Sequence, residues 1–510
     1  MIATTSPDRP LEGAQLWLVV LLIALGNFLV VLDTTIANVS VPTIAGSLGV
    51  SASQGSWVIT SYAVAEAITV PLTGWLSSRF GAQRVFILCY LGFAVLSMLC
   101  GLSMSLGMLV ACRVALGLCG GPIMPLAQTL MMRILPPEKQ VLGTVIWAMT
   151  TLIGPIVGPV LGGTLCDNVG WESIFFISVP FALVGGLLLI VMLRGRKDEL
   201  VKAPIDMVGL GLLVVWVGAL QIMLDEGRNH DWFASAEIRG LGIIAALGFV
   251  AFLIWELTEK NPIVDLRIFR HRGFTATTIT YSLGFGAFFA QIVILPLWLQ
   301  QNLGYTATWA GYATGMMGIF AVLSAPVVGQ LAAKMDPRKI IFTGILGLGG
   351  LAYWRAGFNS DVTFLQLAIP TLLTGPCMVM FFVPTIGLAM ASVAPGEEAN
   401  AAGLSNFSRT LFGAFATSLV QTSWENEATR AQTAMAGAMP MGQQALDSLT
   451  SMGQSMESAV ATLDRIVQGQ SVMVATMHIF TTIAVCFVAS ALIIWFAPKP
   501  KGPIDTSAAH

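Results

Sequence analysis

Charged residues are scarce in this chain, and their scarcity excludes most soluble folds. Only 10% of the 510 residues are Asp, Glu, Lys or Arg, while 55% are hydrophobic, and the mean hydropathy is +0.80. Soluble domains usually carry about 25% charged residues. The composition therefore predicts a polytopic membrane protein of the all-α class.

Other features are also missing, and each absence removes a class of function. The net charge is −2 and the basic residues are scattered over short loops, so there is no basic patch for nucleic acid. The seven cysteines lack CxxC spacing, which argues against a disulfide framework or a zinc site. The four histidines form no metal-like cluster, and no GxxxxGK[ST] phosphate loop occurs. We therefore expect no metal, no cofactor and no enzymatic activity.

Long apolar segments recur along the whole chain. A membrane-spanning helix needs about 20 mostly apolar residues, and about fourteen segments meet this requirement. We expect spans at 15–38, 53–76, 84–103, 106–132, 142–166, 173–194, 207–226, 238–258, 274–300, 307–333, 339–358, 363–391, 403–424 and 472–497.

The loops between these segments differ in charge. If the N-terminus is inside, most basic residues lie in cytoplasmic loops, and the outer loops hold only Arg228, Arg239, Arg430 and Arg465. Cytoplasmic loops carry an excess of Lys and Arg. The pattern therefore predicts that both termini are cytoplasmic, with tails at 1–14 and 498–510.

Two loop sequences, 74–84 and 329–339, repeat each other. A glycine, a leucine and two basic residues are in register in both. We infer two related six-span bundles, 15–194 and 274–497, joined by a linker with two extra spans at 195–273. Secondary transporters with parallel repeats place the substrate site between the repeats. A chance match of two short loops is the alternative.

Four motifs make the chain resemble the major facilitator superfamily, specifically its fourteen-span drug:proton antiporters. They are LDTTIANVSVP at 32–42, GWLSSRFGAQR at 74–84, LVACRVALG at 109–117 and GPIVGPVLGG at 154–163. Shorter segments are similar to the EmrB-type efflux pumps, namely 11–15, 220–225, 304–311 and 404–407. The loop motif departs from the family pattern, because Ser78 replaces an acid and Ala82-Gln83 replaces a basic pair.

Three ionisable side chains lie inside predicted spans. Asp33 is an acid at a depth where a charge costs roughly 2.5–3.5 kcal/mol at the span centre. Glu66 lies about halfway through the second span, where a carboxyl that alternates between wet and dry surroundings can take up and release a proton. Arg113 lies in the fourth span and requires a buried partner. Asp33 and Glu66 are both candidates for that partner, and packing alone is the alternative role for either acid.

The depth of these residues in the spans, the expectation of an apolar cavity with a few polar groups and the resemblance together predict roles for these and other residues. Proton coupling would involve Asp33, Glu66 and Arg113. Substrate binding would involve Asp33, Glu66, Asn27, Trp57, Tyr62, Gln128, Phe285, Gln291 and Phe381. Conformational change would involve Gly74, Arg79, Gly81 and Arg84 in the loop, and Gly154, Pro155, Gly158, Pro159, Gly162 and Gly163 in the fifth span. In that span the glycines form a ridge for close helix packing, while the prolines remove backbone donors and bend the helix.

The segment 425–471 is too polar to cross a bilayer and is expected outside as a periplasmic loop. Its apolar residues recur at helical spacing: Leu446, Leu449, Met452, Met456, Val460, Leu463 and Val467. The resemblance implies that this side meets a periplasmic adaptor of the EmrA type, which reaches an outer-membrane channel. Folding of the stripe back onto the transporter is the alternative.

Together these features predict a proton-coupled efflux transporter in the bacterial inner membrane. It would export amphipathic or hydrophobic toxic compounds by alternating access between two bundles. A membrane sensor or scaffold without transport, a sodium-coupled carrier and an importer remain alternatives.

Overall fold

The computed structural model describes residues 13–136, 139–194, 206–227, 230–305, 307–360, 362–394, 397–437, 442–452 and 455–499. Every predicted span coincides with a helix or a consecutive helix pair to within a few residues at its ends, and the described residues contain no strand. The all-α prediction is therefore confirmed. Most of the predicted cytoplasmic tails and the first part of the linker, 195–205, lie outside the described residues.

The N-terminal helices form one bundle. They are α1 (Gly13–Ser47), α3 (Trp57–Phe80), α4 (Ala82–Gly101), α5 (Leu106–Ile134), α6 (Gln140–Asn168) and α8 (Ser178–Met192), with the short α2 (Ala52–Gly55) and α7 (Ser173–Phe176). Helix α1 packs against α6, α3 against α5, and α4 against α5 and α8. Gly81 joins α3 to α4 with a φ of 92°, a conformation that favours glycine.

The C-terminal helices form a second bundle. They are α11 (Arg272–Gln301), α12 (Ala307–Lys334), α13 (Pro337–Ala356), α14 (Phe364–Ala391), α15 (Glu398–Gly437) and α17 (Met456–Ile493), which the short η5 (Ile494–Phe496) follows. Helix α12 packs against α14, α13 against α14 and α17, and α11 against α15 and α17. The two bundles meet where α15 contacts α3 and α5, and where α6 contacts α12 and α14.

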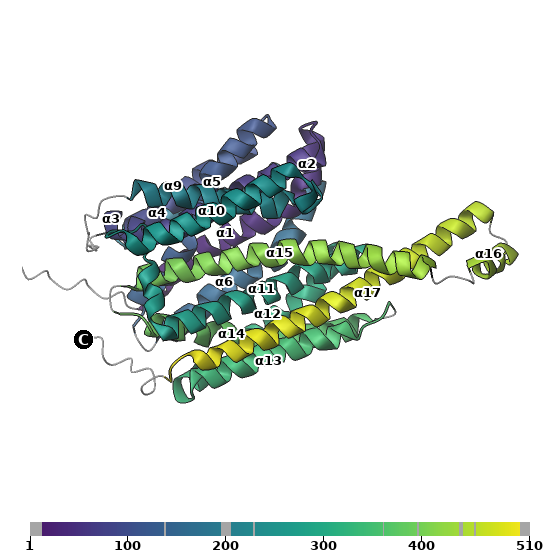
Figure 1. Ribbon diagram of the computed structural model, residues 1–510. Coiled ribbons are helices and arrows are strands. Elements are labelled where there is room, and N and C mark those ends of the chain that lie inside the picture. Colours follow the sequence, from purple (N-terminus) through teal and green to yellow (C-terminus); the bar gives the residue numbers. More distant parts are fainter. Residues whose placement is uncertain are drawn as a thin grey trace, which may run out of the picture.

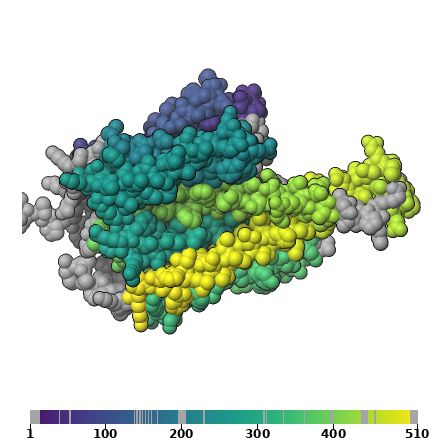
Figure 2. Space-filling model, in the orientation of Figure 1, coloured from purple at the N-terminus to yellow at the C-terminus, as the bar shows by residue number. Residues whose placement is uncertain are grey.

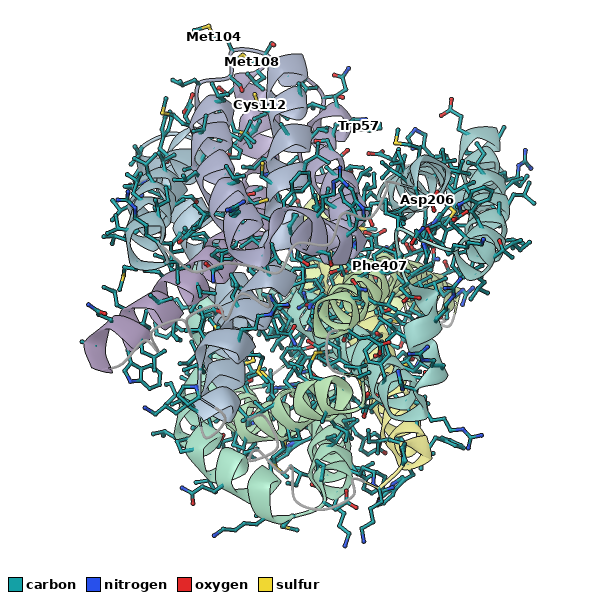
Figure 3. The ribbon with its side chains drawn as sticks, turned by 90° about the vertical axis from the view of Figure 1, so that its left-hand side faces the viewer. Trp57, Met104, Met108, Cys112, Asp206 and Phe407 are labelled. Carbon is teal, nitrogen blue, oxygen red and sulfur yellow. The ribbon has the colours of Figure 1, made fainter. Side chains whose placement is uncertain are left out.

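An additional helix pair, α9 (Met207–Glu226) and α10 (Ala236–Thr258), lies beside both bundles (Figure 1). Asp206 begins α9 by accepting hydrogen bonds from the backbone of Gly209 at 2.8 Å and the indole of Trp255 at 3.0 Å. Trp216 of α9 meets Phe407 of α15 edge to face, with 5.9 Å between ring centroids. Figure 3 shows Asp206 in this pair and Phe407 in the neighbouring α15. The short η3 (Trp232–Ala234) joins α9 to α10, and η4 (Leu266–Arg270) leads into α11.

Most of the long helices are apolar enough to cross a membrane. Among the described residues, nine helices are long and apolar enough to cross a membrane, or ten if the bent pair in α12 counts as one span. Helices α3, α6, α13 and α15 do not meet this criterion. Three of them, α3, α6 and α15, lie where the bundles meet. The exact count of fourteen spans therefore stays a prediction.

Helices α15 and α17 extend beyond the rest of the molecule. Figures 1 and 2 show both projecting past the bundle, with α16 (Gly442–Ser451) beside the tip. Most of the predicted outer segment, 425–471, therefore belongs to the projecting ends of α15 and α17. The apolar stripe is divided between α16 and α17 instead of following one helix. Met452 and Met456, at the division, are 78% and 53% exposed.

Candidate functional site

A cavity of about 380 Å³ lies between the two bundles. Residues of α1, α3, α5 and α6 line one side, those of α11 and α15 line the other, and α9 closes a third side. The wall is mostly apolar with several polar groups, as is usual for small-molecule sites. The polar and charged wall residues are Thr34, Thr35, Ser56, Thr60, Tyr62, Glu66, Arg113, Thr151, Gln221, Asp225, Arg409, Thr410, Thr417, Ser418 and Gln421.

Asp33 and Arg113 form an ion pair at the wall of the N-terminal bundle. Arg113 Nη1 lies 2.5 Å from Asp33 Oδ2, and each residue is 1% exposed. Arg113 Nε also donates to the carbonyl of Val58 at 2.9 Å, and its guanidinium lies 4.3 Å from the ring centre of Tyr62. The structure therefore selects Asp33, of the two candidate acids, as the partner of Arg113.

Glu66 is separate from that pair and lines the cavity directly. The N-terminal bundle positions it through glycines, because α5 approaches α3 closely here. A Cβ on Gly117 would lie 2.5 Å from the carbonyl oxygen of Tyr62, and one on Gly121 would lie 2.9 Å from that of Glu66. Small residues allow such close approach between helices in membranes. Close packing thus holds this acid at the cavity wall.

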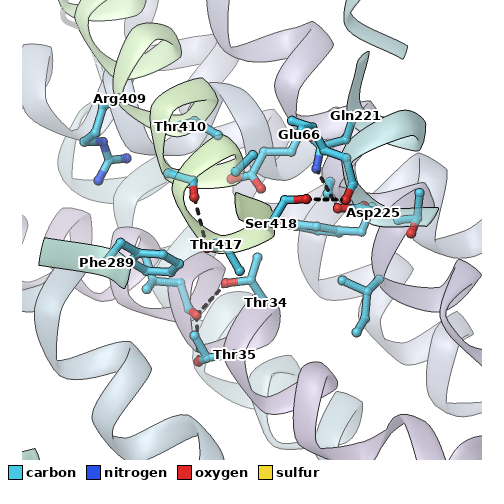
Figure 4. Close-up of a pocket in the computed structure, with 18 of the residues that line it drawn as sticks. Thr34, Thr35, Glu66, Gln221, Asp225, Phe289, Arg409, Thr410, Thr417 and Ser418 are labelled. Atoms are coloured by element: carbon cyan, nitrogen blue, oxygen red, sulfur yellow. Dashed lines mark hydrogen bonds between the residues drawn. The ribbon is translucent and has the colours of Figure 1, made fainter. Parts of the chain in front are cut away.

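Helix α9 contributes a wall of the cavity and connects the bundles. Ser418 of α15 donates to the carbonyl of Leu224 at 2.6 Å, and Ser56, at the start of α3, donates to Glu226 at 2.8 Å. Within α9, Gln221 donates to Asp225 at 3.2 Å. Figure 4 shows Glu66, Gln221, Asp225 and Ser418 close together on one side of the cavity. The additional helix pair is therefore part of the site.

Arg409 of α15 is a second buried cation at the cavity wall, and it is 3% exposed. Its guanidinium lies 4.8 Å from the ring centre of Phe285 and 5.9 Å from that of Trp147. Nη2 donates to the sulfur of Met124. Among the described residues, Nε has no hydrogen-bond partner and no carboxylate forms an ion pair with Arg409.

Helix α15 closes one end of the cavity. Asn400 of α15 packs tightly against Gly74 of α3. A Cβ added to Gly74 would lie only 1.9 Å from Oδ1 of Asn400. Two turns on, Asn406 donates to Gln128 of α5 at 2.9 Å. The cavity begins beyond these contacts and reaches Gln421, which also lines a second cavity of about 510 Å³ between α11, α15 and α17. The bundles are thus closed around the N-terminal part of α15 and separated around its middle.

The glycine ridge of α6 packs against α1. A Cβ added to Gly154 would lie 2.5 Å from Val31, and one added to Gly158 would lie 2.2 Å from the hydroxyl of Thr35. A Cβ added to Gly162 would lie 3.0 Å from Ile36. Thr35 also donates to the carbonyl of Gly154 at 3.1 Å. Gly163 has no heavy atom within 4 Å of its Cβ position, so it lies off the contact. The side chains of Pro155 and Pro159 lie outside the described part of the structure.

The predicted substrate residues divide into two groups. Glu66, Tyr62 and Phe285 are at the cavity wall. The others lie elsewhere in the described structure, namely Asp33, Asn27, Trp57, Gln128, Gln291 and Phe381. Asn27 instead binds Thr150 and Thr151 of α6 at 2.8 and 2.9 Å, while Trp57 is 39% exposed at the edge of the bundle (Figure 3).

The two repeated loops differ in their charge interactions. In the second, Asp336 begins α13 and Arg338 lies 2.8 Å from its carboxylate; hydrogen bonds from Arg338 hold the pKa of Asp336 below its ordinary value. In the first, Ser78 donates to the carbonyl of Gly74 at 2.9 Å, and Arg79 and Arg84 are exposed. Asp336 of the second loop is thus aligned with Gly81 of the first loop.

A second group of charges, at the N-terminal ends of α11 and α15, joins those two helices. Arg270 and His271 lie 2.8 and 3.1 Å from the carboxylate of Glu397. Burial acts to raise the pKa of Glu397. Hydrogen bonds from the backbone of Ala394 and from His271, together with the charge of Arg270, outweigh it and hold that pKa below its ordinary value.

Several wall residues were missed because sequence periodicity does not show which face of a helix meets a cavity. Arg409 is visible in the sequence as a cation within a span, and Gln221 and Asp225 lie in a segment that resembles EmrB-type pumps. Only the packing of α9 and α15 brings the three to one cavity. The remaining polar wall residues, such as Thr417 and Ser418, carry no signal that separates them from other small polar residues in spans.

Two helical bundles around a central cavity, with buried charges in its wall, define a membrane transporter and not an enzyme. Residues 23–417 match the family described as Major Facilitator Superfamily. The chain belongs to this superfamily.

Curated relatives align over nearly the whole chain. The multidrug export protein EmrB of Escherichia coli (strain K12) is 40% identical over 500 residues, covering 97% of this chain and 98% of that protein. The fatty acid resistance protein FarB of Neisseria gonorrhoeae is 39% identical, covering 96% and 98%. Among solved structures, the proton:xylose symporter XylE has a TM-score of 0.58 at 14% identity, covering 97% of this chain and 99% of that one, and shows the fold alone.

Proposed function

We propose that this protein is a proton-coupled multidrug efflux transporter that exports amphipathic or hydrophobic toxic compounds. The observation that carries the proposal is the cavity between the bundles, whose mostly apolar wall includes Glu66 and Arg113, the latter paired with the buried Asp33 behind the wall. The extended similarity to a multidrug export protein supports the same function. The energy would come from the proton gradient, as the family resemblance implies.

The proposed mechanism is alternating access. The cavity is closed around the N-terminal part of α15 and lies toward the end from which α15 and α17 project. With both termini in the cytoplasm of a bacterial inner membrane, this arrangement is an outward-facing state. Glu66 would exchange protons with the cavity, and the Asp33–Arg113 pair would pass the change in charge to the packing of α1, α3 and α5.

The proposed partners lie on the outer side. The tip of the projection exposes apolar residues, with Met452 directly after α16 and Met456 at the start of α17, so it offers a docking surface for a periplasmic adaptor of the EmrA type. That adaptor would connect the transporter to an outer-membrane channel. We expect the purified protein to transport without the adaptor, because residues of this chain line the cavity.

The test is transport by the purified protein in liposomes. We expect an added drug to dissipate an imposed pH gradient, and Glu66→Gln and Asp33→Asn each to abolish the coupling while the protein stays inserted. Glu427→Gln, which changes an acid on the projecting part of α15, is the matched control and should transport normally. A response to sodium but not to protons would overturn proton coupling, and full activity in both acid variants would overturn the site. No response to any compound would favour a sensor.

A further inference from the structure

We propose that Asp225, near the outer end of α9, controls closure of the cavity on the outer side, because its carboxylate has to bind a proton before the bundles can close around it. The acid lines the cavity from the additional helix pair, which belongs to neither bundle. This inference rests on the proposed function in treating the chain as an alternating-access transporter. It goes further in giving α9 a part in the transport cycle, with Asp225 as a positioning residue.

Asp225 lies between two contacts that join α9 to opposite bundles. Its neighbour Leu224 accepts a hydrogen bond at 2.6 Å from Ser418 of α15, in the C-terminal bundle. Its other neighbour, Glu226, accepts one at 2.8 Å from Ser56, which precedes α3 in the N-terminal bundle. Movement of one bundle relative to the other therefore changes the surroundings of this carboxylate.

The hydrogen bonds of Asp225 leave part of its carboxylate unsatisfied. Oδ1 accepts a hydrogen bond from Gln221 at 3.2 Å, and Thr60 of α3 also interacts with the carboxyl group. Oδ2 is buried and accepts no hydrogen bond from the described residues. Figure 4 shows Asp225 with Gln221 and Ser418 at the cavity, on the side away from Arg409. A negative charge here is consequently stabilised only by neutral partners.

The surrounding elements do not supply a cation for this acid. Among the described residues, none forms an ion pair with Asp225. Arg239 is exposed, and His230 lies 3.8 Å from the carboxylate of Glu226 instead. The ionisable residues of the cavity wall and of the neighbouring helix ends are Glu66 of α3, Arg113 of α5, Arg409 and Glu425 of α15, Glu237 and Arg239 of α10, Glu226 of α9, and His230 and Asp231 after it.

The lack of a counter-charge couples the protonation of Asp225 to closure. Burying a carboxylate without a positive partner is costly, whereas a neutral carboxyl group loses its water at a much lower cost. In the outward-facing arrangement the cavity supplies water to the ionised acid. Closure brings α3 and α15 together around α9 and removes that water, so Asp225 first takes a proton from the outer medium and becomes a neutral carboxyl group. The proton returns to the outer medium on reopening, and acid outside therefore favours the closed state.

Distance measurements between two spin labels test this inference on the full chain in lipid nanodiscs. In a variant whose native cysteines are replaced, one label is attached at Met104→Cys, between α4 and α5, and the other at Leu365→Cys, at the start of α14. Both native side chains are exposed. Glu66→Gln is present throughout, so that the other acid of the cavity wall does not contribute to the pH response. We expect acidification to raise the population of the short distance at least about fivefold.

Two substitutions of Asp225 separate its charge from its packing. Asp225→Asn should give the short distance at every pH, and Asp225→Glu, which keeps a carboxyl group, should retain the pH response. The matched control is Glu237→Gln, which changes an exposed acid at the start of α10 and should leave the response unchanged. A pH response that persists in Asp225→Asn would overturn the inference, and so would the absence of a response while Asp225 is present.

Infrared difference spectra of the same acidification test the inference without relying on the folding of Asp225→Asn. The stretching band of the protonated carboxyl group should shift in Asp225→Glu, because aspartic and glutamic acid absorb at different frequencies. A band that this substitution leaves in place would overturn the inference. Failure of the proposed function looks different, because liposomes would then export no drug while the distance between the labels still followed the pH.

Discussion

Asp33 and Arg113 neutralise each other within the N-terminal bundle, and that pairing explains how two charges persist where lipid surrounds the protein. Both side chains are buried and 2.5 Å apart. Removing one partner of such a pair leaves the other charge unpaired, which costs about 3–5 kcal/mol. The stability of the bundle therefore depends on keeping the charges balanced.

The first prediction concerns this balance. Asp33→Asn should lower the free energy of unfolding by about 3–5 kcal/mol, and Asp33→Asn combined with Arg113→Gln should recover a substantial part of the loss. Chemical denaturation in detergent micelles measures both. A double variant no more stable than the single one would show that the two charges are not coupled.

The second prediction concerns Asp336, whose pKa is lowered by Arg338. Since the folded-state pKa is below the unfolded one, the contribution to stability is present above the ordinary pKa of about 3.9 and disappears as the pH falls through the lowered value. At pH 7, Asp336→Asn should cost about 1 kcal/mol. Denaturation curves of the two proteins should converge in acid, and a difference that grows at low pH would contradict this assignment.

At the scale of whole helices, the contact between α1 and α6 depends on residues without side chains. Gly158 faces the hydroxyl of Thr35 and the backbone of Ile36, whereas Gly163 faces open space. The sequence motif identified the ridge as a whole. The motif could not show that Gly163 lies outside the contact, because this depends on where α1 packs against α6.

The third prediction uses this difference. Gly158→Ala should force α1 and α6 apart and cost about 1–3 kcal/mol, the usual cost of overpacking, with a corresponding loss of transport. Gly163→Ala is the matched control and should remain within about 0.5 kcal/mol of the unchanged protein. Melting curves and liposome transport measure the pair, and equal effects of both substitutions would exclude the ridge as the cause.

At the scale of the molecule, the sequence predicted the helices well and the site only in part. Hydropathy and the family motifs identified the segments and the charges Asp33, Glu66 and Arg113, because lipid restricts where polar residues can occur. Helix rotation and inter-bundle packing are not encoded in local periodicity. They decide that Phe381 is buried in the C-terminal bundle while Arg409 reaches the cavity. The role of α9 as a cavity wall was missed for the same reason.

The fourth prediction concerns the closure between the bundles. In a variant without the seven native cysteines, a cysteine at Ser418 should react with a membrane-impermeant maleimide several-fold faster than one at Asn406, since Ser418 lines the cavity and Asn406 is buried against Gln128. Adding Gly74→Ala, which forces Asn400 away from α3, should reduce the difference. Equal reaction rates before that change would contradict the outward-facing arrangement.

The projection of α15 and α17 has a mechanical consequence. Helix α15 contains 40 residues, so at 1.5 Å per residue its end lies about 30 Å from its midpoint. A rotation of the C-terminal bundle by about 15°, the size of a subunit rotation in an allosteric protein, would sweep that end through about 8 Å. Helix α15 would then convert a small rearrangement around the cavity into a larger displacement of its end, and this displacement would act on any protein bound there.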